Sequence, residues 1–134
     1  MIAVDTSVVV AALAAWHEGH TTSRETVQRR PRLIAHVALE TYSVLTRLPP
    51  PHRVSPAVVH AYLLRQFPEP WLTLAAEEHR SLLDTLHRRG VGGGAVYDAL
   101  VAATAVAAGA TLLTRDVRAR PVYALLNADV QVLR

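Results

Sequence analysis

The sequence predicts an α/β fold in three layers, with a central parallel sheet of about five short strands covered by helices on both faces. Short apolar segments alternate with longer segments of helical pattern along the chain. Neighbouring parallel strands need a crossover connection, and helices of this length provide one. With 134 residues, the chain is expected to form a single domain spanning residues 1–134.

The expected strands are short and apolar, as in a sheet that is buried on both faces. The first, IAVD, is rich in β-branched residues, which fit a packed pleat. The strands are expected at residues 2–5, 32–35, 71–75, 110–115 and 130–133.

The expected helices lie between these strands, and several have clear start or stop signals. Ser55 and Pro56 are typical of a helix start, with a capping hydroxyl and a proline at the first helical position. Gly90 and Gly109 stand where helices are expected to end. The helices are expected at residues 6–16, 21–30, 36–48, 55–67, 76–89, 96–108 and 118–127.

The composition excludes several classes of function. Half of the residues are hydrophobic (51%), which favours a packed core, but no apolar run reaches the roughly 18 residues of a membrane span. No membrane contact is expected, and the strand-like start without a signal peptide predicts a cytoplasmic protein. The absence of cysteine excludes disulfides, thiolate metal sites and cysteine nucleophiles.

The type of basic residue excludes further functions. All fourteen are arginine, so a P-loop lysine and Schiff-base chemistry are excluded. The planar guanidinium of arginine binds two phosphate oxygens at once. With a formal net charge of +3, a polyanionic partner is one interpretation, and a solvated basic surface is the other.

Four of the eleven acidic residues lie in apolar surroundings: Asp5, Glu40, Asp98 and Asp116. Each has a structural explanation on its own. Asp5 and Asp116 follow strands and are suited to cap the next helix, whereas Asp98 suits a helix N-terminus. Glu40 is a possible partner of Arg47.

Taken together, the four acids predict a metal site. Ligand sites in open parallel sheets form beyond the carboxyl ends of the strands, where Asp5 and Asp116 stand. Converging carboxylates raise one another's pKa unless a cation is present, and hard divalent ions prefer oxygen ligands. We therefore expect Mg²⁺ or Mn²⁺ held by Asp5, Glu40, Asp98 and Asp116. Thr6, Ser7 and Thr114 are expected to orient these ligands, and Arg115 and Arg118 are candidates for contacts with the phosphates of a nucleic acid.

The motifs VDTS, LETYSVLTR, YDALVAATA and LLTRD resemble, in order and spacing, those of PIN-domain proteins, and more narrowly of VapC-type toxins. This resemblance implies a PIN-like fold and a Mg²⁺- or Mn²⁺-dependent endoribonuclease, with catalytic acids matching Asp5, Glu40, Asp98 and Asp116. It implies the toxin of a toxin–antitoxin pair, with structured RNA as the substrate, a cognate antitoxin as the inhibitor, and a homodimer. Many family members carry a further acidic or asparagine residue after the fourth motif, whereas Val117, Arg118 and Ala119 stand here.

Other functions remain open at this stage. A degenerate PIN-like module would dock a partner without catalysis. A receiver domain would use a lysine and a paired acidic motif, and a haloacid-dehalogenase-type phosphatase would have an aspartate where Ser7 stands. The tryptophans and tyrosines are scattered, which indicates core packing rather than a platform for bases. The apolar face of residues 55–67 suits either the core or a protein partner.

Overall fold

The computed structural model describes all residues from 1 to 134 and has one parallel sheet of four strands in the order β2-β1-β3-β4. The strands are β1 (Ile2–Val4), β2 (Arg32–Leu33), β3 (Thr111–Thr114) and β4 (Val130–Val132). The predicted α/β class and the parallel pairing are confirmed. The sheet has four strands rather than about five.

The missing strand is the segment 71–75, which pairs with the sheet at a single residue. Leu72 bridges to Ile34, and its N–H donates to the carbonyl of Leu33. A helix begins at Ala35, directly after this bridge. Pairing stops there because the neighbouring backbone has turned away into that helix.

The helices cover most of the remaining chain. The expected helix at 118–127 is in fact a short 3₁₀ turn followed by a short α-helix, and the other helices end within three residues of the expected limits. Their bounds are α1 (Thr6–Leu13), α2 (His20–Gln28), α3 (Ala35–Thr46), α4 (Pro56–Gln66), α5 (Ala76–Arg89), α6 (Ala95–Ala107), η1 (Val117–Ala119) and α7 (Arg120–Leu125).

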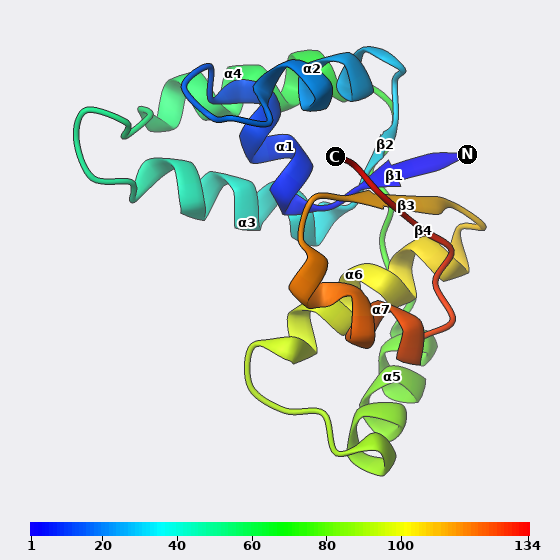
Figure 1. The fold of residues 1–134 in the computed structure, drawn as a ribbon. Helices are drawn as coiled ribbons and strands as arrows, with labels where there is room; N and C mark the ends of the chain where they lie inside the picture. The colour runs from blue at the N-terminus through cyan, green and yellow to red at the C-terminus, as the bar shows by residue number, and fades with distance from the viewer.

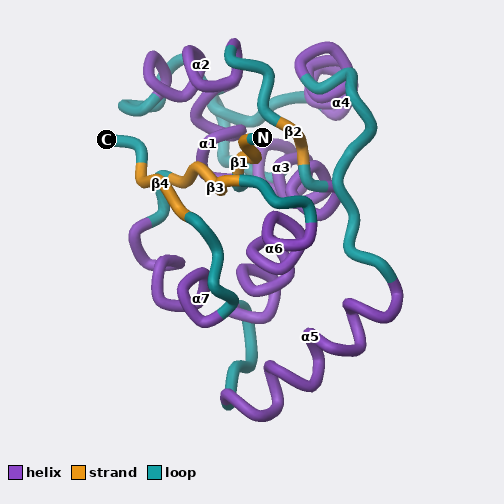
Figure 2. Tube along the Cα trace, turned by 90° about the vertical axis from the view of Figure 1, so that its right-hand side faces the viewer, coloured by secondary structure: helices purple, strands orange, loops and turns teal.

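The helices lie on both faces of the sheet, as the alternating pattern predicts. In Figure 1, α1 and α2 lie above the strands and α6 and α7 lie below them. Figure 2, turned by 90°, shows the same separation, with α5 at the lower edge of the molecule. None of the helices has the length and the apolar character required to cross a membrane.

The sheet forms the centre of the core. Val4, Leu33, Leu112 and Leu113 are almost fully buried in one cluster with apolar residues of the surrounding helices. In the register of β1 and β3, Val4 pairs with Leu113, so the residues that follow both strands meet at one edge. This pairing brings Asp5 close to Thr114 at the carboxyl ends of the strands.

Candidate active site

Asp5 is held at the end of β1 by hydrogen bonds from several directions. It caps α1, with Oδ1 accepting from the N–H of Ser7 at 3.1 Å and from the Ser7 hydroxyl. Oδ2 accepts from the hydroxyls of Thr114 and Tyr123, the latter at 2.8 Å. Asp5 is only 4% exposed, so these donors take the place of water around the carboxylate.

The environment of Asp5 also changes the protonation of its neighbours. Burial raises the pKa of Asp5, and the hydrogen bonds from Ser7, Thr114 and Tyr123 oppose that shift. The pKa of Tyr123 is raised by burial and by the charge of Asp5. Tyr123 therefore keeps its proton and remains a hydrogen-bond donor to Asp5 over the physiological pH range.

Asp116 follows β3 and has a similar local role. Its Oδ1 accepts from the N–H of Arg118 at 3.0 Å and caps the short η1 turn. The Arg118 guanidinium forms an ion pair with the same oxygen at 3.3 Å. The N–H of Asp116 donates to the Thr114 hydroxyl at 2.9 Å, which links Asp116 to Asp5 through one threonine.

Glu40 approaches from the middle of α3. The Thr6 hydroxyl donates to its Oε1 at 2.9 Å, and Nε2 of His36, one helical turn earlier, lies 3.6 Å from the same oxygen. The possible pairing with Arg47 is wrong: that guanidinium donates to the hydroxyl of Ser43. Arg47 lies beyond the end of α3, one turn past Ser43, so its side chain reaches Ser43 and not Glu40.

Asp98 stands in the first turn of α6, and its carboxylate accepts no hydrogen bond from the protein. Burial raises its pKa most, and the charges of Asp116, Glu40 and Asp5 raise it further, whereas Arg118 lowers it. The carboxylates of Asp116, Glu40 and Asp5 therefore lie near enough to Asp98 to disfavour its charged form.

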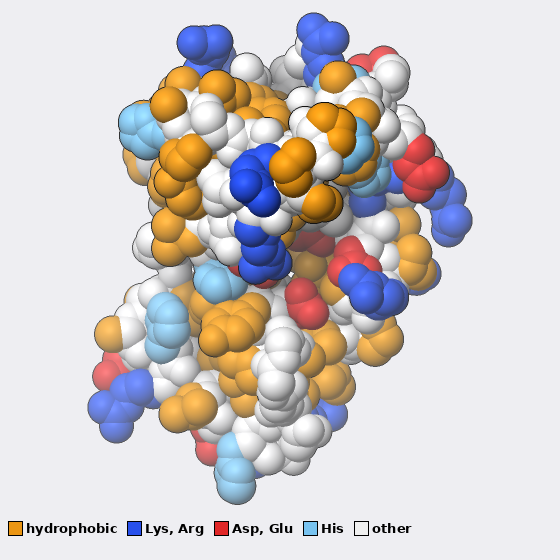
Figure 3. All heavy atoms as spheres, turned by 90° about the vertical axis from the view of Figure 1, so that its left-hand side faces the viewer, with side chains coloured by type: hydrophobic (Ala, Val, Ile, Leu, Met, Phe, Trp, Pro, Cys, Tyr) orange, Lys and Arg blue, Asp and Glu red, His pale blue; other side chains and the backbone are white.

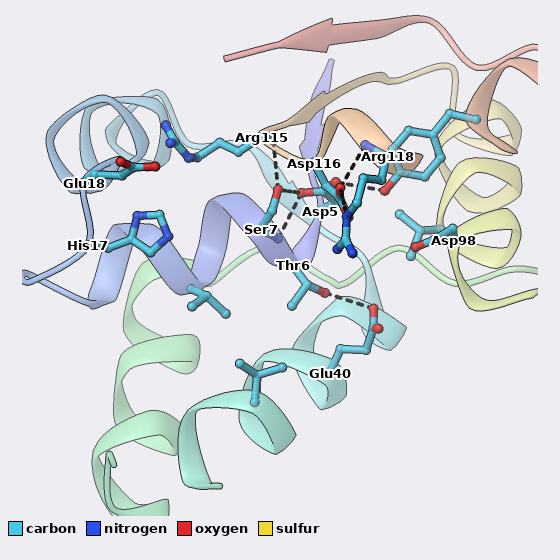
Figure 4. Close-up of a pocket in the computed structure, with 14 residues that line it drawn as sticks. Asp5, Thr6, Ser7, His17, Glu18, Glu40, Asp98, Arg115, Asp116 and Arg118 are labelled. Carbon is cyan, nitrogen blue, oxygen red and sulfur yellow. Dashed lines mark hydrogen bonds and ion pairs between the residues drawn. The ribbon is translucent and has the colours of Figure 1, made fainter. Parts of the chain in front are cut away.

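All four acids line one cavity of about 540 Å³. Figure 4 shows Glu40 on α3 and Asp98 on α6 on one side, and Asp5 and Asp116 at the strand ends on the other. On the surface, acidic atoms gather in a hollow with arginine beside them (Figure 3). The lining residues are Asp5, Thr6, Ser7, Val10, His17, Glu18, Glu40, Val44, Asp98, Val101, Arg115, Asp116, Arg118 and Tyr123.

The cavity suits a hard divalent cation that retains part of its water shell. No three acidic or histidine side chains come close enough together to form a metal-binding group by themselves. Mg²⁺ does not require this, because it is usually held by one or two carboxylates with waters completing its shell. Asp98 has both carboxylate oxygens free of protein hydrogen bonds, and Glu40 and Asp116 each have one. The oxygens of Asp5 are already engaged.

The two arginines that line the cavity, Arg115 and Arg118, differ in their contacts. The Arg115 guanidinium lies against Gly19, so closely that any side chain at position 19 would collide with it. The Arg115 N–H donates to the Ser7 hydroxyl at 2.8 Å. Arg118 pairs with Asp116 and is 92% exposed, so it remains accessible to a ligand.

Sequence reasoning missed three polar residues of this cavity. Tyr123 was expected among the core aromatics, and its hydroxyl binds Asp5. His17 and Glu18 stand in the loop after α1 and line the cavity. Nothing in the local pattern marks the three residues, because they reach the site through the path of a loop and the packing of α7.

Comparisons with known proteins extend over the whole chain. Residues 2–125 match the family model of the PIN domain. The chain is 55% identical over 133 residues to Ribonuclease VapC40 of Mycobacterium tuberculosis, covering 99% of each, and 39% identical over 132 residues to Ribonuclease VapC27 of the same organism, covering 98% and 96%. The structure of VapBC2 from Rickettsia felis, bound to a DNA fragment from its promoter, superposes with a TM-score of 0.68 at 17% identity over both full chains, which indicates a shared fold.

Proposed function

The chain belongs to the PIN domain family as a VapC-type member, and from this premise we propose that it is an endoribonuclease, the toxin of a toxin–antitoxin pair. It hydrolyses phosphodiester bonds of RNA. The relatives at 55% and 39% identity are named as ribonucleases, and this identity over nearly the full chains supports the same reaction here.

One observation carries the assignment: four carboxylates from four separate elements face a single cavity, and one of them is left without a partner. Burial and the acidic neighbours raise the pKa of Asp98, so its charged form is held in this position at a cost to the fold. Perturbed acids in a cavity are typical of functional sites. Such a cluster suits a reaction in which a bound cation neutralises the negative charge of the substrate.

The proposed cofactor is Mg²⁺ or Mn²⁺. Asp98, Glu40 and Asp116 have free carboxylate oxygens to hold the ion. Asp5 holds Ser7 and Thr114 in place through its hydrogen bonds. When bound, the ion supplies a water of lowered pKa and stabilises the charge that develops on the phosphate. Thr6 keeps Glu40 pointed toward the cavity by its hydrogen bond to Oε1.

The arginines complete the proposed site by holding the RNA backbone. Arg115 lines the cavity beside His17, at the end of the cavity formed by the loop after α1. Arg118 is exposed at the opposite edge, beside Asp116. A guanidinium binds phosphate oxygens in pairs, so these two side chains contact phosphates on either side of the acidic centre.

The proposed partners are the RNA substrate and a cognate antitoxin, and the proposed working state is a cytoplasmic homodimer. The exposed apolar side chains of α3 and α4, including Leu39 and Leu64, line a small apolar pocket together with Tyr42. An exposed apolar surface of this kind supports a protein partner. Gel filtration with light scattering tests the dimer.

A non-catalytic binding module is the second candidate, and two observations favour it. Both oxygens of Asp5 are engaged by protein donors, and Arg118 pairs with Asp116. In such a module, the acids would receive a basic segment of the partner and cleave nothing.

Sequencing of cleaved RNA ends after brief expression separates the two functions. The wild-type protein is expected to produce new ends at discrete positions, and Asp98→Asn is expected to produce none. Glu78→Gln, which changes an exposed acid of α5 away from the cavity, serves as the control and should cut like the wild type. Identical RNA ends with wild type and Asp98→Asn would reject the nuclease.

A further inference from the structure

Two aromatic rings form a stack directly beside the acidic cavity. The rings of His36 on α3 and Tyr97 on α6 are nearly parallel, at an interplanar angle of 5° with centroids 5.3 Å apart. Each ring is tied in sequence to one of the acids: Tyr97 precedes Asp98, and His36 lies one helical turn before Glu40. Neither ring lines the cavity itself, but Nε2 of His36 lies 3.6 Å from Oε1 of Glu40, which does, so the stack lies at the margin of the cavity.

Tyr97 is exposed although it stands in a helix that is otherwise largely apolar and buried. It is 53% exposed, whereas Ala99, Val101 and Ala102 of the same helix are buried. One face of the Tyr97 ring is covered by His36. The preceding glycines 92–94 have nothing within 4 Å of the space that a Cβ would occupy, so no side chain of this segment is present to cover the exposed part of the Tyr97 ring.

We propose that the Tyr97 ring, backed by His36, is a stacking site for one unpaired base of the RNA strand whose phosphate enters the acidic cavity. The inference rests on the proposed function for the identity of the strand. Aromatic side chains beside a phosphate-binding site are the usual means by which proteins bind single-stranded nucleic acid, because every base has a π-face. Glu40 and Asp98 face the shared cavity from the two helices that carry the stack (Figure 4).

The arrangement defines the kind of RNA that fits. A base in a continuous duplex is stacked on both faces by its neighbours, so it cannot also lie on Tyr97 unless it leaves the helix. The substrate segment is therefore unpaired at this position. The contact is independent of base identity, which assigns sequence selection to other residues.

Binding of a pool of single-stranded RNA of random sequence, measured by fluorescence anisotropy with Ca²⁺ in place of Mg²⁺, tests this site. Tyr97→Ala is expected to weaken binding about tenfold or more, the usual range for loss of one stacked base. Tyr97→Phe keeps the ring and should bind like the wild type. Tyr42→Ala removes another exposed tyrosine, one that lines the apolar pocket of α3 and α4, and should change nothing.

A second probe separates stacking from a purely structural role of Tyr97. An abasic strand retains ribose and phosphates but offers no base, so wild type and Tyr97→Ala should bind it equally. Equal binding of the random pool by both proteins, or an equal loss on both probes, would overturn the proposal. So would a wild-type protein that fails to bind the random pool.

Photo-cross-linking of the wild-type protein to the same pool covers the case in which Tyr97→Ala does not fold. A nucleotide adduct is expected on Tyr97, and adducts found only elsewhere would reject the site. If RNA is bound through Tyr97 but is never cut in Mg²⁺, the stacking site stands and the nuclease assignment fails. If RNA is cut but Tyr97 does not contribute to binding, the nuclease assignment stands and the stacking site fails.

Discussion

The two sides of the acidic cavity hold their carboxylates in opposite ways. At the strand ends, Asp5 accepts hydrogen bonds from Ser7, Thr114 and Tyr123, and it also caps α1. On the helical side, Asp98 accepts none, and its pKa is raised by burial and by three neighbouring acids. The hydrogen bonds to Asp5 belong to the packing of the fold, whereas Asp98 is held in place despite repulsion from the neighbouring carboxylates.

This difference separates structural from functional requirements within one cavity. A carboxylate that caps a helix and accepts buried hydroxyls stabilises the native state whether or not a ligand binds. Asp98 has no such donors, and repulsion from its acidic neighbours makes its charged form destabilise the native state until a cation binds. We therefore expect substitutions on the two sides to affect activity and stability in different proportions.

The largest effect on activity is expected from Asp98→Asn. Loss of this free carboxylate should reduce RNA cleavage by more than about a hundredfold, since even groups that only support a metal ligand account for 10- to 100-fold. The thermal midpoint of the metal-free protein should rise at neutral pH, because one of the repelling charges is removed. Cleavage assays and calorimetric melting check the two parts, and a lower midpoint would contradict the assignment of repulsion to Asp98.

Asp5→Ala is expected to reverse that balance by damaging the fold first. It removes the cap of α1 and leaves the buried hydroxyls of Thr114 and Tyr123 without an acceptor. We expect a loss of about 2–4 kcal/mol in the free energy of unfolding, from the cap and the unpaired polar groups together. Asp5→Asn keeps an acceptor for the Ser7 N–H and should lose less, as urea unfolding would show.

Thr6→Val tests whether the position of Glu40 matters. Valine matches threonine in shape but cannot donate to Oε1 of Glu40, so the carboxylate loses its main restraint. Cleavage is expected to fall about tenfold, as for other groups that orient a metal ligand, with little change in stability. A matched change at Thr46, whose hydroxyl binds the carbonyl of Tyr42 on the same helix as Glu40, should leave cleavage unaltered.

The pH dependence of stability should come from Asp98 and Asp5, because the pKa of each carboxyl is raised in the folded protein. The folded-state pKa of Asp98 lies above its ordinary value of 3.8, so the folded protein binds the proton more tightly than the unfolded chain. Stability of the metal-free protein should therefore rise as pH falls toward 3.8 and decrease as pH rises through the folded pKa. Asp98→Asn should flatten this slope in urea titrations, and an unchanged slope would assign it to the pKa of Asp5, which is also raised.

The smallest effect is expected from Arg118→Ala. The guanidinium pairs with Asp116 and lowers the pKa of Asp98, so it partly takes the place of a cation at this edge. Its removal should tighten Mn²⁺ binding severalfold while weakening RNA binding. Arg120→Ala, two residues further along the chain, is the control and should alter neither.

Sequence alone was enough for the α/β class, the parallel sheet and the positions of the helices. The strand at 71–75 could not be rejected, because its composition suits a strand and only the turn of α3 at Ala35 leaves it without a partner. The segment 118–127 does not form the single expected helix, because Asp116 caps a separate 3₁₀ turn before Pro121. Both errors came from backbone geometry that neighbouring segments impose.

The candidate acids were recognisable because charged residues in apolar segments are rare without a partner or a task. The residues that surround these acids could not be recognised from the sequence. Tyr123 looks like a core residue in the sequence, and Tyr97 gives no sign that it remains exposed beside its helix. Both roles depend on how distant helices pack, which no periodicity within a single segment encodes.

Calorimetric titration with Mn²⁺ tests most directly whether Asp98, Glu40 and Asp116 form one cation site beside Asp5. We expect the wild-type protein to bind the ion, Asp98→Asn and Glu40→Gln to lose most of that affinity, and Glu78→Gln to bind like the wild type. If the wild type shows no binding at millimolar Mn²⁺, or if Asp98→Asn binds the ion as well as the wild type does, Asp98, Glu40 and Asp116 do not form a metal centre.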